Sequence, residues 1–254
     1  MDRAVQDQLL GLNRQFYEQF ADDFAETRSS RQPGLGQLLA FLPIGGRWLD
    51  VGCGNGRLAT LLDTAGREAA YVGVDASARL VEIARRNAAS LQRVRAEFRV
   101  MDVAIDGWAS GWPPASFDAI TLLAFLHHLP GWKARQELLS TLRLLLVPGG
   151  VLALSTWQFL NEERLRRKIA PWERVGLEAG QLEPGDYLLD WRRGGYGLRY
   201  CHLIDQAEME SLARSAGLVV RRLFYADGAS GALNLFGVLE SPDPGKAINE
   251  SASW

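Results

Sequence analysis

A glycine-rich segment at 52–56 (GCGNG) directly follows the short apolar segment Arg47–Val51, and a helical pattern begins at Arg57. Glycines at such a turn let the main chain bend sharply and let a ligand approach the backbone closely. The glycines are spaced G-x-G-x-G, and the acidic residue Asp50 precedes them. This spacing differs from the phosphate-binding pattern GxxxxGK[ST] and from the dinucleotide pattern GxGxxG. The segment therefore predicts a strand–turn–helix unit that binds a ligand of another kind.

Strand and helix patterns alternate along the chain from this turn onward. We expect strands at 47–51, 70–74, 97–101, 117–123, 151–156, 218–225 and 233–239, and helices at 4–26, 35–42, 57–64, 78–89, 133–146 and 206–216. Such alternation predicts an α/β fold with a doubly wound, mostly parallel sheet of the Rossmann-like type. The last two strands are joined by a short loop, whereas a parallel crossover needs about a dozen residues or more. This last pair should therefore be antiparallel.

The expected elements fit one domain that covers residues 1–240. Its parts are an N-terminal helical cover (1–45), a ligand-binding core (46–157), an insertion on the substrate side (158–203), and a closing helix with two strands (204–240). The polar tail 241–254 is expected to be disordered. Basic and acidic residues nearly balance within 160–200, which is compatible with a pair of salt-bridged helices.

Two acidic residues follow neighbouring strands of the predicted sheet. Asp75 ends the second strand and Asp102 ends the third. Ligands of doubly wound sheets bind at the carboxyl ends of the strands, near the switch point. A carboxylate at Asp75 can accept hydrogen bonds from both hydroxyls of a ribose, and Asp102 could reach an adenine amine. The alternative for Asp75 is a helix cap, and Asp102 has a purely structural alternative as well.

The ordered motifs WLDVGCGNGRL, VGVDAS, VMDV, FDAITLLAFLHHL and LVPGGVLALSTW resemble those of class I S-adenosylmethionine-dependent methyltransferases, over residues 47–156. The resemblance implies a seven-stranded sheet with an antiparallel last strand. It also implies S-adenosylmethionine as cofactor and S-adenosylhomocysteine as product. The residues it would place at the cofactor are Tyr17, Arg28, Asp50, Gly52, Cys53, Gly54, Asn55, Asp75, Ala76, Asp102, Val103, Leu123 and Ala124.

Segments near the two ends carry a narrower resemblance. The stretches 16–28 (FYEQFADDFAETR), 185–191 (GDYLLDW) and 198–203 (LRYCHL) are similar to those of the tRNA wobble-uridine carboxymethyl methyltransferases, with Phe20 and Cys201 as departures. In that group the first helix covers the cofactor, and a carboxymethyl group on the uridine is esterified. The resemblance implies tRNA as a partner, together with a possible small activator subunit.

The segment 191–202 contains three Arg and three aromatic residues but no acidic residue. Arginine and ring faces together suit a splayed-out base and its backbone, and the alternative is a structural lid over the cofactor. The candidate substrate-binding residues are His127, Trp191, Arg199, Tyr200 and His202.

The nature of the acceptor decides which residues are catalytic. A carboxylate acceptor needs no general base, and Arg199 or Arg28 could orient it. A hydroxyl or ring-carbon acceptor needs a base, for which His128, His127 and His202 are candidates because imidazoles titrate near neutrality. We select His128 and Arg199 as the catalytic residues. The alternative for the His127–His128 pair is that it caps the strand-to-helix loop.

Composition narrows the classes of function further. Lys and Arg number 28 against 30 Asp and Glu, so the net charge of −2 excludes a protein coated with basic charge for unselective nucleic-acid binding. Two Cys and three His lack metal-ligand spacing, so no metal site is predicted. The N-terminal residues lack the apolar region of a secretory signal, and no apolar run approaches the about 20 residues that span a bilayer. We therefore expect a cytoplasmic protein without membrane contact.

Three functions remain at this stage, and the oligomeric state is open. The first is methyl transfer to a modified tRNA uridine. The second is O- or C-methylation of a small acceptor such as a quinone precursor or secondary metabolite. The third is a non-catalytic regulator that binds S-adenosylmethionine. A nicotinamide dehydrogenase is disfavoured by the glycine spacing.

Overall fold

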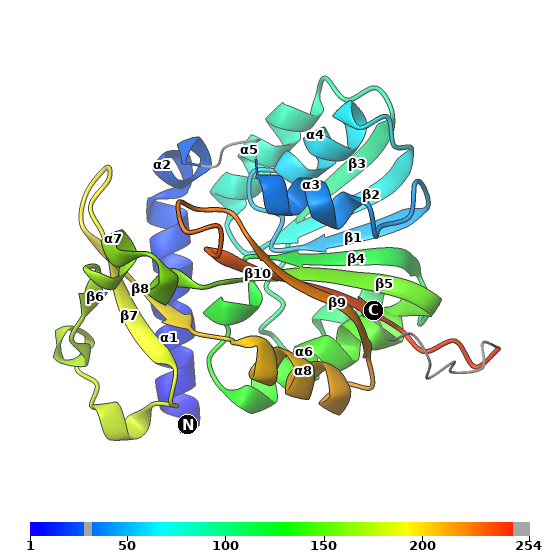
Figure 1. Cartoon of the computed structure of the whole chain (residues 1–254). Coiled ribbons are helices and arrows are strands. Elements are labelled where there is room, and N and C mark those ends of the chain that lie inside the picture. Colours follow the sequence, from blue (N-terminus) through cyan, green and yellow to red (C-terminus); the bar gives the residue numbers. More distant parts are fainter. Residues whose placement is uncertain (28–31, 246–254) are drawn as a thin grey trace.

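A sheet of seven strands forms the centre of the protein (Figure 1). The computed structural model describes residues 1–27 and 32–245. The strands are β1 (Arg47–Val51), β2 (Ala69–Asp75), β3 (Val94–Val100), β4 (Phe117–Leu123), β5 (Leu146–Trp157), β6 (Ile169–Ala170), β7 (Asp186–Trp191), β8 (Gly197–His202), β9 (Val219–Ala226) and β10 (Asn234–Glu240). The α-helices are α1 (Arg3–Gln19), α2 (Ala21–Glu26), α3 (Pro33–Leu39), α4 (Arg57–Thr64), α5 (Ala78–Ala88), α6 (Trp132–Leu145), α7 (Glu163–Arg166) and α8 (Gln206–Ser215). None of these helices is both long and apolar enough to cross a membrane.

The strands of the large sheet follow the order β3-β2-β1-β4-β5-β10-β9. β10 pairs antiparallel with both of its neighbours, and the other pairs are parallel. This confirms the predicted doubly wound sheet and its antiparallel last strand. The chain leaves β1 first toward β3 and later toward β5, so β1 and β4 meet at the switch point, where such sheets bind ligands.

Two apolar clusters fix helices to the two faces of this sheet. Trp48 on β1 faces one cluster and Leu49 faces the other, and both side chains are fully buried. Helices α3, α4 and α5 pack on the Trp48 side, whereas α6 and α8 pack on the Leu49 side (Figure 1). Because both faces are covered, β1 is an apolar run rather than an alternating strand.

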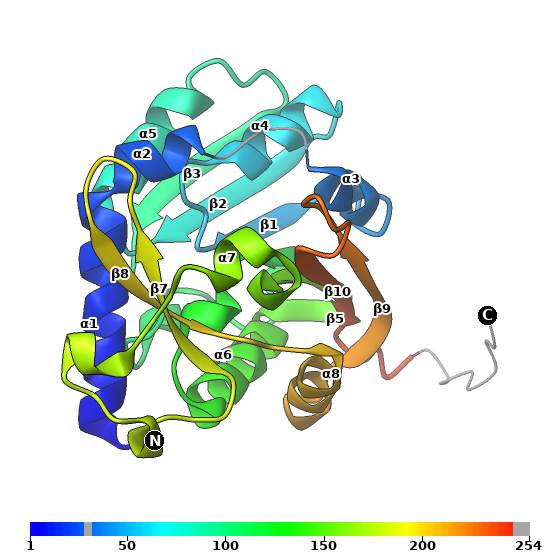
Figure 2. The same cartoon turned by 60° about the vertical axis from the view of Figure 1, so that its left-hand side comes forward.

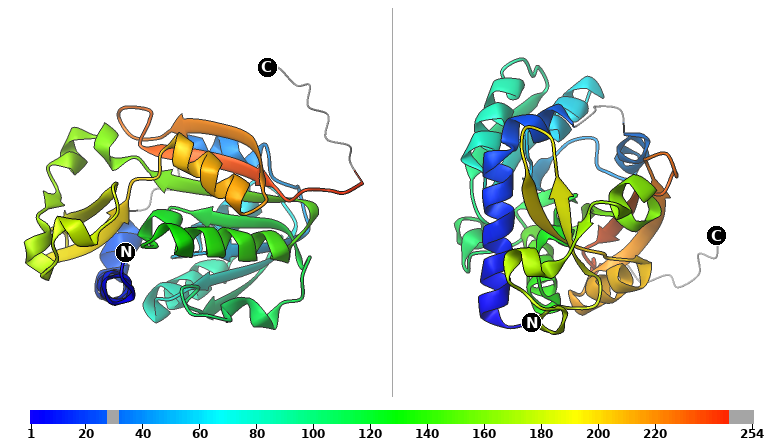
Figure 3. Two further views of the ribbon diagram at one scale, coloured as in Figure 1. Left: turned by 90° about the horizontal axis from the view of Figure 1, so that it is seen from below. Right: turned by 90° about the vertical axis from the view of Figure 1, so that its left-hand side faces the viewer.

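A second sheet of order β6-β7-β8 forms within the insertion, and α1 lies along β8 (Figures 2 and 3). The buried side chain of Asn13 makes the link. Its Nδ2 donates to the carbonyls of Tyr200 at 3.1 Å and His128 at 3.2 Å, and its Oδ1 accepts from the Tyr200 N–H at 2.8 Å. Helix α1 is thereby tied both to the insertion and to the loop after β4.

Several expected boundaries were wrong. The salt-bridged helix pair within 160–200 is absent from the described structure, because β7 and β8 form a hairpin there. The expected helix 4–26 is two helices, since Phe20 leaves the helical conformation (φ −107°, ψ 22°). β3 begins at Val94, where its pairing with Ala69 of β2 starts. We predicted that residues 241–254 are disordered. Residues 246–254 of this tail lie outside the described part of the chain.

Candidate functional site

A cavity of about 530 Å³ lies at the carboxyl ends of the central strands, beneath α1 and α2. The predicted site residues that line it are Tyr17, Gly52, Cys53, Gly54, Asn55, Asp75, Ala76, Asp102, Leu123, Ala124 and His128. Asp50 and Val103 are not among the lining residues, and Arg28 lies outside the described residues. A cavity of this size falls within the range of small-molecule and cofactor sites.

The glycine-rich turn forms the floor of the cavity, and its glycines have positive φ angles. Gly52 adopts a φ of +70°, and its N–H donates to the carbonyl of Val74 at 2.8 Å. A Cβ atom at this position would lie 2.4 Å from Cδ2 of Phe125. Gly54 (φ +54°) lines the cavity, and a Cβ there would meet no atom within 4 Å. The turn thus leaves main chain open at the cavity, and its contact with the cofactor stays a prediction.

Asp75 joins this turn to the start of α5. Its Oδ2 accepts from the Gly54 N–H at 3.0 Å, and its Oδ1 accepts from the Ser77 N–H at 2.9 Å. Burial raises the pKa of Asp75, and these two hydrogen bonds act in the opposite direction. Each carboxylate oxygen keeps a lone pair for a further donor. The carboxylate can therefore organise the turn and still accept ribose hydroxyls, while the cap of α5 is Ser77, whose Oγ accepts from the Leu80 N–H.

We expect Asp75→Ala to weaken the binding of S-adenosylhomocysteine by about 1–3 kcal/mol, the scale of hydrogen bonds to a charged group. Isothermal titration calorimetry measures this change. Asp63→Ala is the matched control, because the Asp63 carboxylate also accepts backbone N–H groups, those of 92–94, but is not among the lining residues of the cavity. Affinity unchanged by Asp75→Ala would remove the ribose assignment.

Side chains of α1 and α2 hold these helices over the cavity. Arg14 Nε donates to Asp102 Oδ2 at 2.5 Å, and Ser77 Oγ donates to Glu18 Oε2 at 2.6 Å. Arg79 pairs with Asp22 on α2. The carboxylate of Asp102, which we predict to contact the adenine, thus also binds Arg14 of the covering helix α1. Arg14 and Glu18 were not predicted as site residues from the sequence, although they lie within one helical turn of Tyr17 on α1.

Asp50 lies beneath the turn rather than at the cavity surface. Its carboxylate accepts hydrogen bonds from Tyr71 Oη and from Thr121 Oγ1, the latter at 2.6 Å. Burial raises the pKa of Asp50 to about 6. The side chain therefore ties β1 to β2 and β4 under the glycine turn. Its direct contact with the cofactor stays a prediction.

His128 presents a ring nitrogen to the cavity in a defined tautomer. It ends the 3₁₀ helix η2 (Leu126–His128), directly after β4. Its Nδ1 lies 3.1 Å from the Tyr200 carbonyl, which can only accept, so Nδ1 carries the proton. Nε2 is then the unprotonated nitrogen, and it accepts from Tyr17 Oη at 2.7 Å. Tyr17 and His128 both line the cavity, so a base and a hydroxyl meet at its wall.

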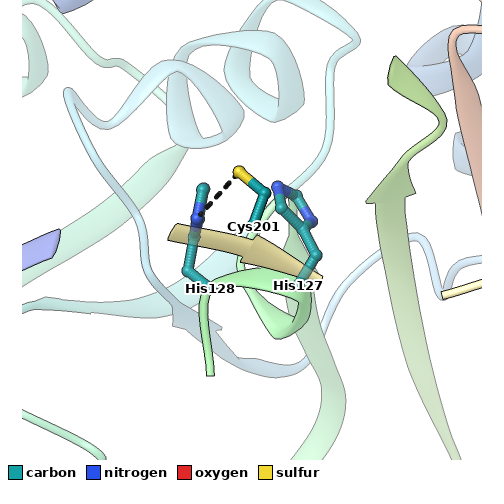
Figure 4. Close-up of side chains that lie close together, drawn as sticks. All are labelled: His127, His128 and Cys201. Atoms are coloured by element: carbon teal, nitrogen blue, oxygen red, sulfur yellow. Dashed lines mark hydrogen bonds between the residues drawn. The ribbon is translucent and has the colours of Figure 1, made fainter. Parts of the chain in front are cut away.

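His127, His128 and Cys201 bring possible metal-ligand atoms within 4.8 Å of one another (Figure 4). His128 Nδ1 lies 3.6 Å from Cys201 Sγ, but its proton is directed to the Tyr200 carbonyl. Nδ1 of His127 accepts from the Trp157 N–H at 3.4 Å. Burial raises the pKa of the Cys201 thiol to about 12, whereas a metal binds the thiolate. These partners disfavour a metal ion, and the expectation of no metal site stays a prediction.

The other predicted substrate residues are buried. The exposed fractions of Arg199, His202 and Trp191 are 4%, 2% and 8%, and Tyr200 is fully buried. The Arg199 guanidinium lies over the rings of Phe16, Trp157 and Trp191 at 5.1, 4.6 and 5.6 Å. His127 is also buried, and none of these five predicted residues lines the cavity. The substrate role of these residues and the catalytic role of Arg199 stay predictions, and the burial disfavours both. The burial favours the alternative that the segment 191–202 is a structural lid.

Charged side chains connect α6, α8 and the insertion in one buried network. Arg135 Nη2 lies 2.8 Å from Glu183 and 3.1 Å from Glu208. His202 Nδ1 lies 2.7 Å from Asp186, and its Nε2 lies 2.9 Å from Glu208. Because both ring nitrogens face carboxylates, the imidazolium form of His202 is the one that satisfies them. Burial lowers the pKa of His202, but the hydrogen bonds to Asp186 and Glu208 raise it above its ordinary value overall.

This geometry predicts that the thermal midpoint falls as the pH rises above 7. A His whose pKa is raised by folding stabilises the protein fully below its unfolded pKa, and that contribution is lost as the pH rises through the folded pKa. Asp50, with a pKa of about 6, is already ionised in this window. Thermal unfolding followed between pH 7 and 9 should show a flatter dependence in His202→Gln than in the unsubstituted chain. Equal slopes would contradict the charged state of His202.

Comparisons with known proteins agree with this geometry. A family described as a methyltransferase domain matches residues 20–223. The chain is 30% identical over 148 residues to the tRNA (carboxymethyluridine(34)-5-O)-methyltransferase ALKBH8 of Mus musculus, over 58% of this chain and 20% of that protein. It is 35% identical over 152 residues to the 27-O-demethylrifamycin SV methyltransferase of Amycolatopsis mediterranei (58% of this chain, 52% of that protein). It is 29% identical over 189 residues to the ubiquinone biosynthesis O-methyltransferase of Paracidovorax citrulli (73% and 69%). The chain thus spans about a fifth of the mammalian relative.

Solved structures share the fold. An S-adenosylmethionine-dependent methyltransferase from Methanosarcina mazei superposes with a TM-score of 0.64 at 20% identity, over 84% of this chain and 99% of that chain. The 1,6-didemethyltoxoflavin-N1-methyltransferase of Burkholderia thailandensis, solved with S-adenosylhomocysteine, gives a TM-score of 0.63 at 18% identity, over 96% and 93%. At these identities the likeness concerns the fold.

Proposed function

The chain belongs to the methyltransferase-domain family with S-adenosylmethionine as its cofactor, and we propose that it methylates a hydroxyl oxygen of a small acceptor molecule. One observation carries this proposal: the unprotonated Nε2 of His128 lies at the cavity wall, with its tautomer fixed by the Tyr200 carbonyl. A hydroxyl becomes a good nucleophile when a positioned base takes its proton. A carboxylate acceptor would leave this nitrogen without a catalytic task.

The cofactor, when bound, supplies a methyl group on a positively charged sulfur. The residues of this chain then have two tasks. Asp75, Asp102 and the glycine turn hold the adenosine end, and correct orientation of the reactants can lower the barrier by about 7–11 kcal/mol. Because His128 Nε2 already accepts from Tyr17 Oη, Tyr17 Oη would take the acceptor's proton as it passes its own proton to Nε2, and the acceptor oxygen would receive the methyl group as the sulfur–methyl bond breaks. The products are S-adenosylhomocysteine, the methyl ether, and a proton on His128 that passes to solvent.

The surroundings of His128 support a planar, largely apolar acceptor. Tyr17, Phe24, Phe125 and Leu129 line the same cavity. Aromatic walls offer edge and face contacts to a ring, which suits a phenol such as a quinone precursor or an aromatic secondary metabolite. The similarity to O-methyltransferases of ubiquinone biosynthesis and of rifamycin is in keeping with this class.

Esterification of a carboxymethyl group on a tRNA wobble uridine is the second candidate. It is supported by the similarity to the mammalian tRNA enzyme and by exposed arginines beside the insertion sheet, among them Arg164, Arg167 and Arg192. Phosphate contacts of this kind give affinity that falls with salt. A small activator subunit belongs to this candidate as a further prediction, and a cytoplasmic location stays a prediction for either candidate.

Product analysis by mass spectrometry separates the candidates. The purified protein is incubated with S-adenosylmethionine and, in separate reactions, with a panel of phenolic quinone precursors and with tRNA that carries carboxymethyluridine. A methyl ether on a phenol supports the proposal. A methyl ester on the uridine would replace it with the second candidate. Binding of S-adenosylhomocysteine without transfer to any acceptor would favour the non-catalytic regulator.

A further inference from the structure

A second cavity, of about 760 Å³, lies at the amino ends of β1, β2 and β3, whereas the first lies at their carboxyl ends. The lining residues that matter here are Arg47, Glu68, Ala70, Gln92, Arg93 and Arg95. The two cavities share no lining residue within the described part of the chain. Because β2 has seven residues at about 3.3 Å each, roughly 20 Å of sheet separates the two. We call this second cavity the arginine groove.

The strand register brings two arginines onto one face of the sheet. Arg47 on β1 and Arg95 on β3 both pair with Ala70 on β2, which lies between them. Partners on adjacent strands point to the same face, and neighbouring strands are about 4.8 Å apart, so the two arginine Cα atoms lie about 10 Å apart. All three residues are exposed. The groove therefore contains an open space above the Ala70 methyl group, between two long basic side chains.

The guanidinium groups of the groove have few partners. Arg47 Nη2 donates to one backbone carbonyl at 3.4 Å, and a guanidinium has five N–H donors. The side chains of Arg93 and Arg95 form no hydrogen bond or ion pair with any residue that the structure describes. Two nearby carboxylates accept from backbone instead: Asp118 from the Arg47 N–H, and Asp63 from three N–H groups at the start of β3. Most of the donors in the groove are therefore available to a ligand.

The charge and size of the groove indicate the class of that ligand. Three arginines line it against one acidic residue, Glu68, and a cleft dominated by one sign of charge concentrates counter-ions. Arginine recognises phosphate through paired N–H donors, and two separated guanidinium groups suit a ligand with several anionic centres. The described lining includes no aromatic ring to stack on a base. The cavity volume lies in the range of small-molecule sites, which favours a metabolite over a macromolecule.

We propose that the arginine groove binds a small metabolite through a chain of phosphate groups. Arg47 and Arg95 contact the chain from the two sides of Ala70, and Arg93 supplies a third cation. The site goes beyond the proposed function, because it takes neither the cofactor nor the methyl acceptor. It lies at the far ends of the strands that carry the glycine turn and Asp75.

Isothermal titration calorimetry of the full chain with sodium tripolyphosphate tests the assignment. The Kd should rise about 10- to 100-fold in Arg47→Gln and in Arg95→Gln, the equivalent of one or two hydrogen bonds to a charged group. Ala70→Leu keeps every charge but fills the space between the two arginines, and it should raise the Kd by about 10-fold or more. Orthophosphate should bind the unsubstituted chain more weakly than tripolyphosphate, since a single phosphate does not span both arginines.

Arg222→Gln is the matched control, because it removes one exposed arginine from β9, at the other edge of the sheet. Its Kd should stay within about twofold of the unsubstituted value, since distant exposed charges are screened. A loss in Arg222→Gln as large as that in Arg95→Gln would overturn the proposal, because it would indicate diffuse attraction. Should one groove arginine variant fail to fold by circular dichroism, the other carries the comparison.

Three further outcomes would overturn the proposal: no binding of tripolyphosphate to the unsubstituted chain, an unchanged Kd in Ala70→Leu, and equal affinity for orthophosphate. Saturating S-adenosylhomocysteine should leave the Kd for tripolyphosphate unchanged, because the two cavities are separate. Competition between the two ligands would place the phosphates in the first cavity and would also overturn the assignment. None of these results depends on whether the chain transfers a methyl group.

Discussion

Replacing His128 by Asn should lower kcat for methylation of a hydroxyl acceptor by about 10²- to 10⁴-fold, the range over which a positioned general base contributes. The Asn side chain cannot accept and release the acceptor's proton near neutral pH. Affinity for S-adenosylhomocysteine should change little in comparison, because Asp75 and the glycine turn, and not His128, are the residues we predict to hold the adenosine end. Single-turnover kinetics with saturating cofactor measure the chemical step.

His127→Asn provides the comparison, because the neighbouring imidazole is buried, bonds to the Trp157 N–H and is not among the residues that line the cavity. Its kcat should fall far less than that of His128→Asn. Retention of the full rate in His128→Asn would contradict the hydroxyl mechanism. It would favour an acceptor that is already ionised, as a carboxymethyl group is.

Arg135→Met should lower the free energy of unfolding by about 3–5 kcal/mol, as expected when one partner of a buried ion pair is removed. Arg135 is only 1% exposed. It donates to the Leu129 carbonyl at 3.1 Å and lies against Glu183 and Glu208, so its loss leaves Glu183 without a cation and Glu208 with His202 alone. Urea or guanidinium unfolding followed by circular dichroism measures the change.

Arg221→Met is the surface counterpart, since Arg221 pairs with Glu240 while its own side chain is 53% exposed. Exposed pairs typically contribute up to about 1 kcal/mol. Adding Glu183→Gln to Arg135→Met should recover part of the lost stability, because it removes the carboxylate that is left without a cation. Similar losses in Arg135→Met and Arg221→Met would mean that the buried network is not what fastens α8 and the insertion to α6.

The predicted strand–turn–helix unit and the central strands agree closely with the structure, because their signals are local. Arg47–Val51 and Phe117–Leu123 are strands with the predicted bounds. The glycine turn requires positive φ angles that few residues besides glycine adopt. Asp75 and Asp102 reach the cavity because parallel strands end at one edge of the sheet.

The structure of the insertion could not be predicted from local sequence signals. Its balanced charges are compatible with paired helices, but β7 and β8 instead pair with each other, and β8 packs against α1. Arg199 looks like a substrate-binding group in the sequence. In the fold its guanidinium is enclosed by three aromatic rings, two of them from the distant elements α1 and β5 and one from the neighbouring strand β7. Likewise, the pairing of Tyr17 with His128, 111 positions apart, depends on how α1 docks rather than on any local pattern.

The Asn13 link has a consequence for exchanging parts between relatives. One amide holds α1 both to the backbone of Tyr200 and to that of His128, so α1, the β7–β8 hairpin and the loop after β4 form a single mechanical unit. A chimera that imports only the hairpin, in order to change acceptor preference, puts at risk the two hydrogen bonds between Asn13 and Tyr200, together with the carbonyl that holds His128 Nδ1. Retargeting this scaffold therefore requires transplanting the first helix and the hairpin as a matched pair.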